Sequence, residues 1–283
     1  MRILHCSDVH ITEDYFALPF WRLGWRRWIA MLELQLGGRS RTYREARTTL
    51  AQIAADGASA DHFILSGDLT AYSLHPEFQG ARDALGALAA DPRRCTVIPG
   101  NHDRYTPGAL KSHRFEKYFG QLLGSDLPEY VAEDGFPFVR LLGAEVAVVG
   151  LCSARVPKVP GMSYGVIGEA QFTALAAILR DARLDGRAVF VVVHHGPFRE
   201  DGSVDKPMHG LRELERLLGM LPGPRFAVLH GHIHHRYHHP ATATRPHIFC
   251  AGSSTEKGHE GYWVIETAGG QISGAQMRRP GEV

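Results

Sequence analysis

The chain has 283 residues, of which 44% are hydrophobic and 22% charged, and its net charge is +1. This is the composition of an ordinary globular protein of one large or two small domains. So small a net charge gives no overall attraction to nucleic acid or to an acidic membrane, and any basic surface must be local.

Cysteine and histidine usage is informative. Four cysteines lie far apart in apolar stretches without C-x-x-C spacing, so we expect reduced core thiols and a cytoplasmic protein. We expect no signal peptide before the first predicted strand, and no apolar run in the sequence reaches transmembrane length. The 17 histidines cluster at 194–195 and 230–239, which favours a metal site.

The chain begins with a predicted strand at 3–7, followed directly by an unusual insertion at about 15–47. The insertion holds seven arginines and three of the four tryptophans: Trp21, Trp25 and Trp28. On a helix these tryptophans lie on one narrow stripe with arginines beside it. Two interpretations stay open: a helix packed on the core, and an interfacial helix whose Trp and Arg side chains contact a membrane surface.

The rest of the chain alternates predicted helices and strands before ending in strands. Hydrophobic periodicity predicts helices at 44–55, 77–90, 109–119, 169–183 and 211–220. Buried strands are expected at 62–66, 95–99, 189–193 and 226–229, and final strands at 248–250, 262–265 and 272–277. Residues 128–150 are expected to be β structure throughout, with a hairpin around Gly143. No repeat or linker divides the chain, so we predict one domain, residues 1–283, of two sheets with helices outside.

Five of the apolar runs end in side chains that can bind metal. These are Asp8 and His10, Asp68, the Asn101-His102-Asp103 group, His194 with His195, and His232 with His234. In α/β sheets the site lies beyond the carboxyl ends of the strands, so the five ends can meet. One such residue alone is more often an ordinary buried polar group, but five ends together argue for a site. Mixed Asp, Asn and His donors suit Mn, Fe or Zn, and they are too many for a single ion.

The motifs D-x-H, G-D, G-N-H-D, H and G-H-x-H, in that order, resemble the calcineurin-like metallophosphoesterases from Asp8 to about Thr255. The resemblance implies an α/β fold, a four-layer αββα sandwich of two mixed β-sheets flanked by helices. It implies a hydrolase of phosphoric esters or anhydrides with two divalent ions, manganese first and iron or zinc as alternatives. The implied ligands of one ion are Asp8, His10, Asp68 and His234, and those of the other are Asp68, Asn101, His194 and His232.

The resemblance also implies a mechanism. Two ions lower the pKa of a bridging water, and the resulting hydroxide attacks phosphorus. His102 then protonates the leaving oxygen or stabilises the phosphoryl oxygens, and Asp103 orients its imidazole. Arg104, Tyr105 and His195 are expected on the substrate side. His5 is expected to be structural, and His230, His235, His238 and His239 are expected to be solvated loop residues or to lie around the metal ligands.

Two resemblances compete for the substrate. Residues 99–105 with G-H-I-H are similar to the class III cyclic-nucleotide phosphodiesterases, which act on substrates of the 3′,5′-cAMP type. Residues 25–34 are similar to a membrane-associated branch that includes the UDP-2,3-diacylglucosamine hydrolases of lipid A synthesis, although one group of those hydrolases has Arg at the position of His102. We favour an amphiphilic phosphate such as UDP-2,3-diacylglucosamine, because rings suit acyl chains and arginines suit phosphate headgroups.

The amphiphilic substrate implies peripheral contact with the inner face of the membrane through Trp21, Trp25 and Trp28. A protein of another class, a non-catalytic scaffold of the same fold, is a further alternative, although every motif position carries the expected residue type. No basic stripe with interleaved aromatic residues lies outside 15–47, so no nucleic-acid partner is expected.

Overall fold

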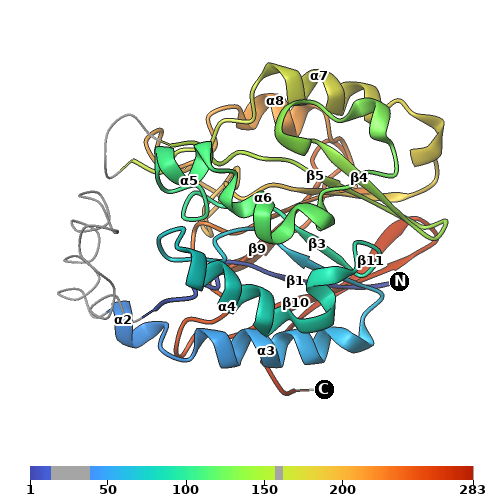
Figure 1. The fold of residues 1–283 in the computed structure, drawn as a ribbon. Helices are drawn as coiled ribbons and strands as arrows, with labels where there is room; N and C mark the ends of the chain where they lie inside the picture. The colour runs from blue at the N-terminus through green and yellow to red at the C-terminus, as the bar shows by residue number, and fades with distance from the viewer. Residues whose placement is uncertain (14–38, 157–161, 283) are drawn as a thin grey trace.

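The computed structural model describes residues 1–13, 39–156 and 162–282 (Figure 1). Trp21, Trp25, Trp28 and the helix predicted around them lie outside the described residues.

Two mixed β-sheets form the centre of the molecule (Figure 1). The first has the order β11-β10-β1-β2-β3, with β1 Arg2–Cys6, β2 His62–Leu65, β3 Cys95–Val97, β10 Tyr262–Ala268 and β11 Gln271–Arg278. The second has the order β4-β5-β6-β7-β9-β8, with β4 Phe138–Leu142, β5 Val146–Gly150, β6 Ala188–Val192, β7 Phe226–His230, β8 Arg236–His239 and β9 His247–Ala251. In the first sheet β1, β2 and β3 are parallel, and β10 and β11 continue it by antiparallel pairing. In the second sheet β5, β6, β7 and β9 are parallel, and the edge strands β4 and β8 are antiparallel.

Helices cover the outer faces of the two sheets (Figure 1). On the side of the first sheet lie α3 Ala46–Asp56 and α4 His75–Leu85, and on the side of the second lie α7 Glu169–Ile178 and α8 Leu214–Gly219. The shorter helices are α2 Arg39–Thr42, α5 Pro107–Lys111 and α6 Arg114–Phe119, and the 3-10 turns are η2 Gly57–Ser59, η3 Gly86–Ala90, η4 Gly120–Leu122, η5 Pro128–Tyr130, η6 Glu133–Gly135 and η7 Ala182–Leu184. This arrangement confirms the predicted αββα sandwich.

The continuous apolar sequence of β6 is explained by burial on both faces. Ala188, Phe190 and Val192 belong to a core cluster that joins the two sheets and also holds Ile3 and Phe63 of the first sheet. The alternate residues, from Val189 to Val193, pack beneath α7 and α8. A core shared by both sheets supports the single domain, which stays a prediction.

Several element boundaries differ from the sequence expectations. Residues 128–137, predicted as β structure, form two 3-10 turns, because Pro128 and Pro137 lack the N–H that a strand ladder needs and Asp134 has a φ of 55°. The helix predicted at 109–119 is divided into α5 and α6 at His113, whose φ is 48°. The helices predicted at 169–183 and 211–220 are shorter, ending at Ile178 and beginning at Leu214.

His230 at the end of β7 and the histidines of β8 also differ from expectation. His230 was expected in a loop or around the metal ligands, but it is fully buried in β7 and its Nε2 lies 3.1 Å from the Tyr237 hydroxyl. His238 and His239 belong to β8, where His238 stacks on Phe249 with ring centroids 3.9 Å apart. Strand β8 was not predicted, because its polar sequence does not alternate between apolar and polar residues. His5 is structural, as predicted: its Nε2 contacts Ser66 Oγ at 2.9 Å.

Acid destabilisation is expected at His62. Its buried ring bonds Arg93 O through Nδ1 and Thr96 Oγ1 through Nε2, at 2.9 and 2.8 Å, and burial lowers its pKa to about 4. The unfolded chain therefore takes up this proton first, so stability is intact above about pH 6.5 and is lost as the pH falls toward 4. The test measures the free energy of unfolding in urea at pH 7 and at pH 4. Between these pH values it should fall by about 2–3 kcal/mol less in His62→Asn than in the wild type.

The matched control is His113→Asn, which removes an exposed imidazole from a turn. Equal pH dependence in His62→Asn and the wild type would show that His62 does not contribute to acid sensitivity.

Candidate metal centre

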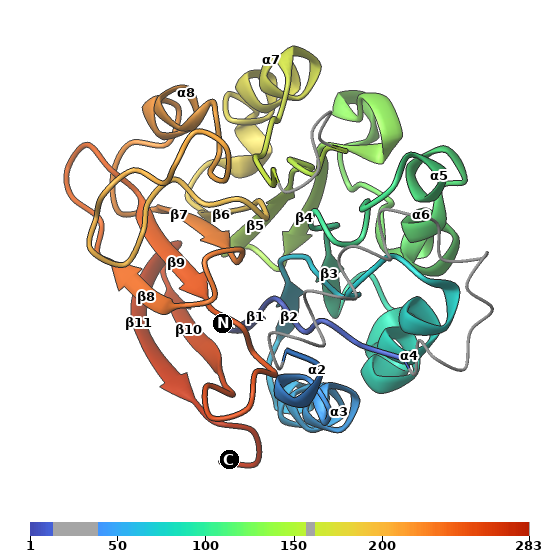
Figure 2. The same ribbon diagram turned by 90° about the vertical axis from the view of Figure 1, so that its left-hand side faces the viewer.

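The loops after β1, β2, β3, β6 and β7 meet at one edge of the sandwich, and Figure 2 looks onto this edge. All seven predicted metal ligands lie in these loops, and their donor atoms form two adjoining clusters.

Cluster 1 consists of Asp8, His10, His234 and Asp68. His234 Nε2 lies 3.2 Å from His10 Nε2 and 3.3 Å from Asp8 Oδ1. His10 Nε2 lies 3.8 Å from Asp8 Oδ1 and 4.0 Å from Asp68 Oδ2. Four donors from three loops thus face a common point.

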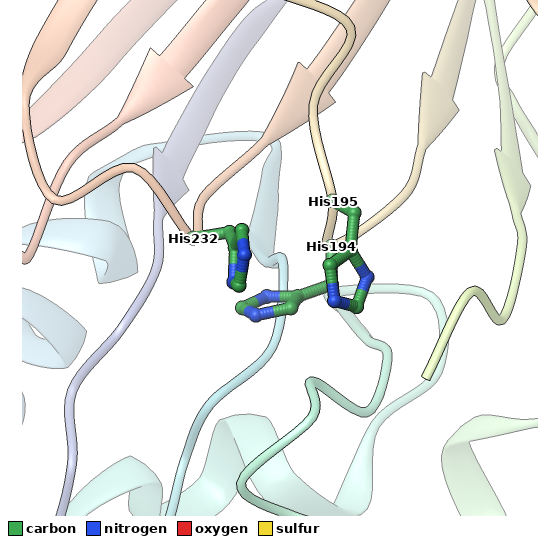
Figure 3. Close-up of side chains that lie close together, drawn as sticks. All are labelled: His194, His195 and His232. Carbon is green, nitrogen blue, oxygen red and sulfur yellow. The ribbon is translucent and has the colours of Figure 1, made fainter. Parts of the chain in front are cut away.

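Cluster 2 consists of Asp68, Asn101, His194 and His232. His194 Nε2 lies 3.3 Å from Asp68 Oδ2 and 3.1 Å from Asn101 Oδ1. The ring of His232 lies 5.2 Å from that of His194, and Figure 3 shows the imidazoles of His194, His195 and His232 gathered beyond β6 and β7. The same oxygen, Asp68 Oδ2, approaches His10 of cluster 1 and His194 of cluster 2, so this carboxylate connects the clusters.

Backbone carbonyls fix the orientation of three imidazoles in the site. His194 Nδ1 lies 2.9 Å from Ser66 O, His232 Nε2 lies 3.0 Å from His209 O, and His102 Nδ1 lies 2.6 Å from Ala71 O. A carbonyl only accepts hydrogen bonds, so each of these nitrogens carries the proton. In the neutral form of each ring the opposite nitrogen therefore carries the lone pair: Nε2 of His194 and His102, and Nδ1 of His232.

The backbone is strained at the same place. Asp8, His10, Asp68, His232 and His234 have positive φ angles of 45° to 69°. Within the described part of the chain they are five of only eight non-glycine residues with positive φ. Each such residue costs about 1–3 kcal/mol and persists only where the surroundings impose it, so this concentration supports a functional role for these loops.

Gly100 and Gly231 leave room for the carboxylates. A Cβ at Gly100 would clash with Asp68 Oδ1, and one at Gly231 would clash with Asp8 Oδ2. Gly100 is therefore required for close approach, not for a positive φ.

Gly100→Ala should displace the carboxylate that the two clusters share. Because a displacement of about 1 Å can cost about 10²-fold, we expect kcat/KM for a phosphodiester to fall by about that factor. Gly120→Ala is the control, because a Cβ there meets open space. Wild-type kcat/KM in Gly100→Ala would contradict the importance of the Asp68 position.

The charges of the site suit cations. Burial would raise the pKa of Asp8, but the close approach of His234 and the charge of His194 outweigh it and lower the pKa to about 2. Burial likewise opposes ionisation of Asp68, and the positive charges of His194 and His102 hold its pKa well below the usual range. Asp8 Oδ1 is buried without a hydrogen-bond partner among the described residues, although His10 and His234 face it. A divalent ion would satisfy this orphaned oxygen, so the residues fit a metal.

His102 faces the clusters, as predicted for a catalytic residue. Its ring meets that of His10 edge-on at 4.9 Å and stacks on Tyr105 at 5.5 Å. The prediction that Asp103 orients this ring is wrong, because Ala71 O holds its Nδ1. Asp103 instead accepts hydrogen bonds from Gly100, Leu69 and Thr70, and so joins the loops after β2 and β3. Burial and the nearby charge of Asp68 raise its pKa to about 7.

The residues expected on the substrate side lie in different places. The Arg104 side chain is 4% exposed and pairs with Glu116 and Asp134, lining a separate cavity of about 420 Å³ with Arg155. His195 is fully buried, with Nδ1 2.8 Å from Ser153 Oγ. Its Nε2 has no hydrogen-bond partner among the described residues, and its ring lies 4.4 Å from that of His232. Tyr105 packs on His102, so it supports that ring directly.

Some residues around the site were not predicted. Asp205 pairs with His209, whose ring lies 4.0 Å from His232 and whose carbonyl holds that ligand. The contact between His209 and His232 could not be predicted from the sequence. Every residue has a backbone carbonyl, and the polar segment around His209 carries no further signal. Tyr43 reaches cluster 1 from the end of the insertion.

The fold and the clusters together describe an αββα protein with a candidate binuclear metal centre. A family model described as "Calcineurin-like phosphoesterase" matches residues 1–236. The chain therefore belongs to the calcineurin-like phosphoesterases, which confirms the predicted family.

A protein named "Probable cyclic nucleotide phosphodiesterase" from Rhodococcus erythropolis (strain PR4 / NBRC 100887) is 31% identical over 195 residues. The match covers 67% of this chain and 56% of that relative, so it spans little more than half of the relative's length.

Solved structures share the fold. A dimetal phosphatase from Danio rerio has a TM-score of 0.62 at 13% identity, covering 99% of this chain and 98% of that one. Purple acid phosphatase PPD1 from yellow lupin (Lupinus luteus) seeds has a TM-score of 0.57 at 12% identity, covering 99% of this chain and 52% of that one. At such low identity these likenesses show the fold alone.

Proposed function

We propose that this protein is a metal-dependent hydrolase of phosphoric esters that works with two divalent ions. The observation that carries the proposal is the shared position of Asp68 Oδ2, 4.0 Å from His10 Nε2 and 3.3 Å from His194 Nε2. When bound, two such ions polarise a phosphoryl group and make a water nucleophilic at neutral pH. Manganese is our first choice, with iron or zinc as alternatives, because the donors mix imidazole, carboxylate and amide groups.

The chain's own residues have separable tasks. Asp8, His10 and His234 would hold one ion and Asn101, His194 and His232 the other, and Asp68 would be common to both. The Ala71 carbonyl keeps a proton on His102 Nδ1, so the ring presents Nε2 toward cluster 1. From there His102 can contact a phosphoryl oxygen or the leaving oxygen. Tyr105 stacks on the ring and limits its rotation.

For the substrate, we propose a cyclic nucleotide of the 3′,5′-cAMP type as the first candidate. The relative at 31% identity is named as a probable cyclic nucleotide phosphodiesterase, and its match covers 67% of this chain. This reverses the order that the sequence alone favoured. The second candidate is an amphiphilic phosphate such as UDP-2,3-diacylglucosamine, supported by the composition of 15–47. It would bring peripheral contact with the inner face of the membrane through Trp21, Trp25 and Trp28, residues outside the described part.

We also propose a cytoplasmic location, supported by four buried cysteines without disulfides. Within the described residues, no helix is both long and apolar enough to span a bilayer.

The test compares hydrolysis of cAMP and UDP-2,3-diacylglucosamine by manganese-loaded protein, with Asp68→Asn as the blank. Turnover of cAMP alone supports the first candidate, and turnover of the lipid nucleotide alone supports the second. If neither is hydrolysed but bis(4-nitrophenyl) phosphate is, both substrates are wrong and the chemistry stands. Activity equal to the blank on every phosphoester would instead support the non-catalytic scaffold.

A further inference from the structure

We propose that Tyr43, together with Glu256, is a positioning residue for the candidate ligand His234. The proposal rests on the proposed binuclear function and deepens it: the last part of the 15–47 insertion belongs to the outer shell of cluster 1. Tyr43 carries none of the motif signals that identified the ligands.

Tyr43 occupies a buried position between α2 and α3, with 3% of its surface exposed. Its hydroxyl oxygen lies 3.4 Å from His234 Nδ1 and 2.9 Å from Ser253 Oγ. Ser253 Oγ in turn lies 2.9 Å from the carbonyl oxygen of Asp8. One side chain therefore connects the ligand loop after β7 with the segment after β9 and, through it, with the ligand loop after β1.

The direction of this chain of hydrogen bonds follows from its last member. The Asp8 carbonyl can only accept, so the Ser253 hydroxyl donates to it and accepts from the Tyr43 hydroxyl. The Tyr43 oxygen is then left to accept the proton on His234 Nδ1. That proton position leaves His234 Nε2 with a lone pair, and Nε2 is the atom that faces Asp8 Oδ1 at 3.3 Å.

Two further contacts strengthen the assignment. The Tyr43 ring meets the His10 ring edge-on at 4.9 Å, so Tyr43 touches two of the four members of cluster 1. Glu256 Oε2 lies 3.9 Å from the same His234 Nδ1 and attracts the same N–H. A carboxylate or hydroxyl at the far nitrogen of a ligating imidazole fixes its ring and makes it a better donor.

His234 differs in this respect from His194 and His232. Backbone carbonyls hold those two ligands, so no substitution removes the contact, whereas side chains hold His234. The difference makes the proposal testable. It also means that a shift of residues 39–43 would change the position of His234 in cluster 1.

The test is calorimetric titration of metal-free protein with Mn²⁺. Wild type should bind two ions per chain. In Tyr43→Phe we expect one ion to bind about 10–100-fold more weakly while the affinity for the other is unchanged. Tyr262→Phe is the matched control: this buried tyrosine bonds Asp56, away from the site, so both affinities should remain those of wild type.

A merely structural role of Tyr43 predicts a different result. Tyr43→Phe would then lower the thermal midpoint of the metal-free protein, as we expect of Tyr262→Phe, without changing either affinity, and that result would overturn the proposal. Glu256→Gln provides a second variant at a half-buried position and should weaken binding of the same ion. Fewer than two ions bound by wild type would instead overturn the binuclear function on which the proposal rests.

Discussion

Asp68→Asn is expected to lower phosphodiester hydrolysis by on the order of 10³-fold or more, because the shared carboxylate holds both ions and each ion contributes several kcal/mol to catalysis. Asp68 Oδ2 lies 4.0 Å from His10 Nε2 of cluster 1 and 3.3 Å from His194 Nε2 of cluster 2. Asparagine keeps the size of the side chain but loses its negative charge. Steady-state hydrolysis of bis(4-nitrophenyl) phosphate with saturating Mn²⁺ measures the effect.

The control for Asp68→Asn is Asp185→Asn, an exposed carboxylate in the turn before β6. It makes the same chemical change away from the site and should leave hydrolysis unchanged. Near wild-type turnover in Asp68→Asn with both ions retained would contradict the assignment of Asp68 as the shared ligand.

His102→Gln is the second large effect. We expect kcat to fall by about 10²–10⁴-fold, because a positioned imidazole contributes that much to proton transfer. Metal content should stay at the wild-type value, since His102 is not among the proposed ligands. The loss should be smaller for a substrate that leaves as 4-nitrophenolate than for one that leaves as an alkoxide, because the better leaving group needs less protonation.

This dependence on the leaving group distinguishes two roles for His102. If the loss is the same for both substrates, His102 stabilises the phosphoryl oxygens and does not act as the acid. If His102→Gln loses a metal ion, the proposed separation between His102 and the ligands is wrong.

The strand ends could be predicted from the sequence because each carries a local signal. A buried apolar run that ends in Asp8, Asp68 or His194 predicts both a strand and a metal-binding side chain at its end. Parallel topology brings such strand ends together. The structure places all of these donors in two clusters connected by Asp68.

The orientation of the imidazoles could not be predicted in the same way. It depends on the carbonyls of Ser66, Ala71 and His209, which the fold brings near from other loops. The expected role of Asp103 failed for this reason: adjacency in sequence suggested a contact with His102, but the carboxylate turns back to the loop after β2. Arg104 likewise turns toward Glu116 and Asp134.

The most direct test of the account is electron paramagnetic resonance of the manganese-loaded protein with its metal content measured in parallel. Two Mn²⁺ ions that share the Asp68 carboxylate should give two ions per chain and the multiline spectrum of an exchange-coupled pair. Asp68→Asn should remove the coupling. One ion per chain, or two ions with the spectrum of isolated Mn²⁺ in the wild type, would contradict a binuclear centre built on Asp68.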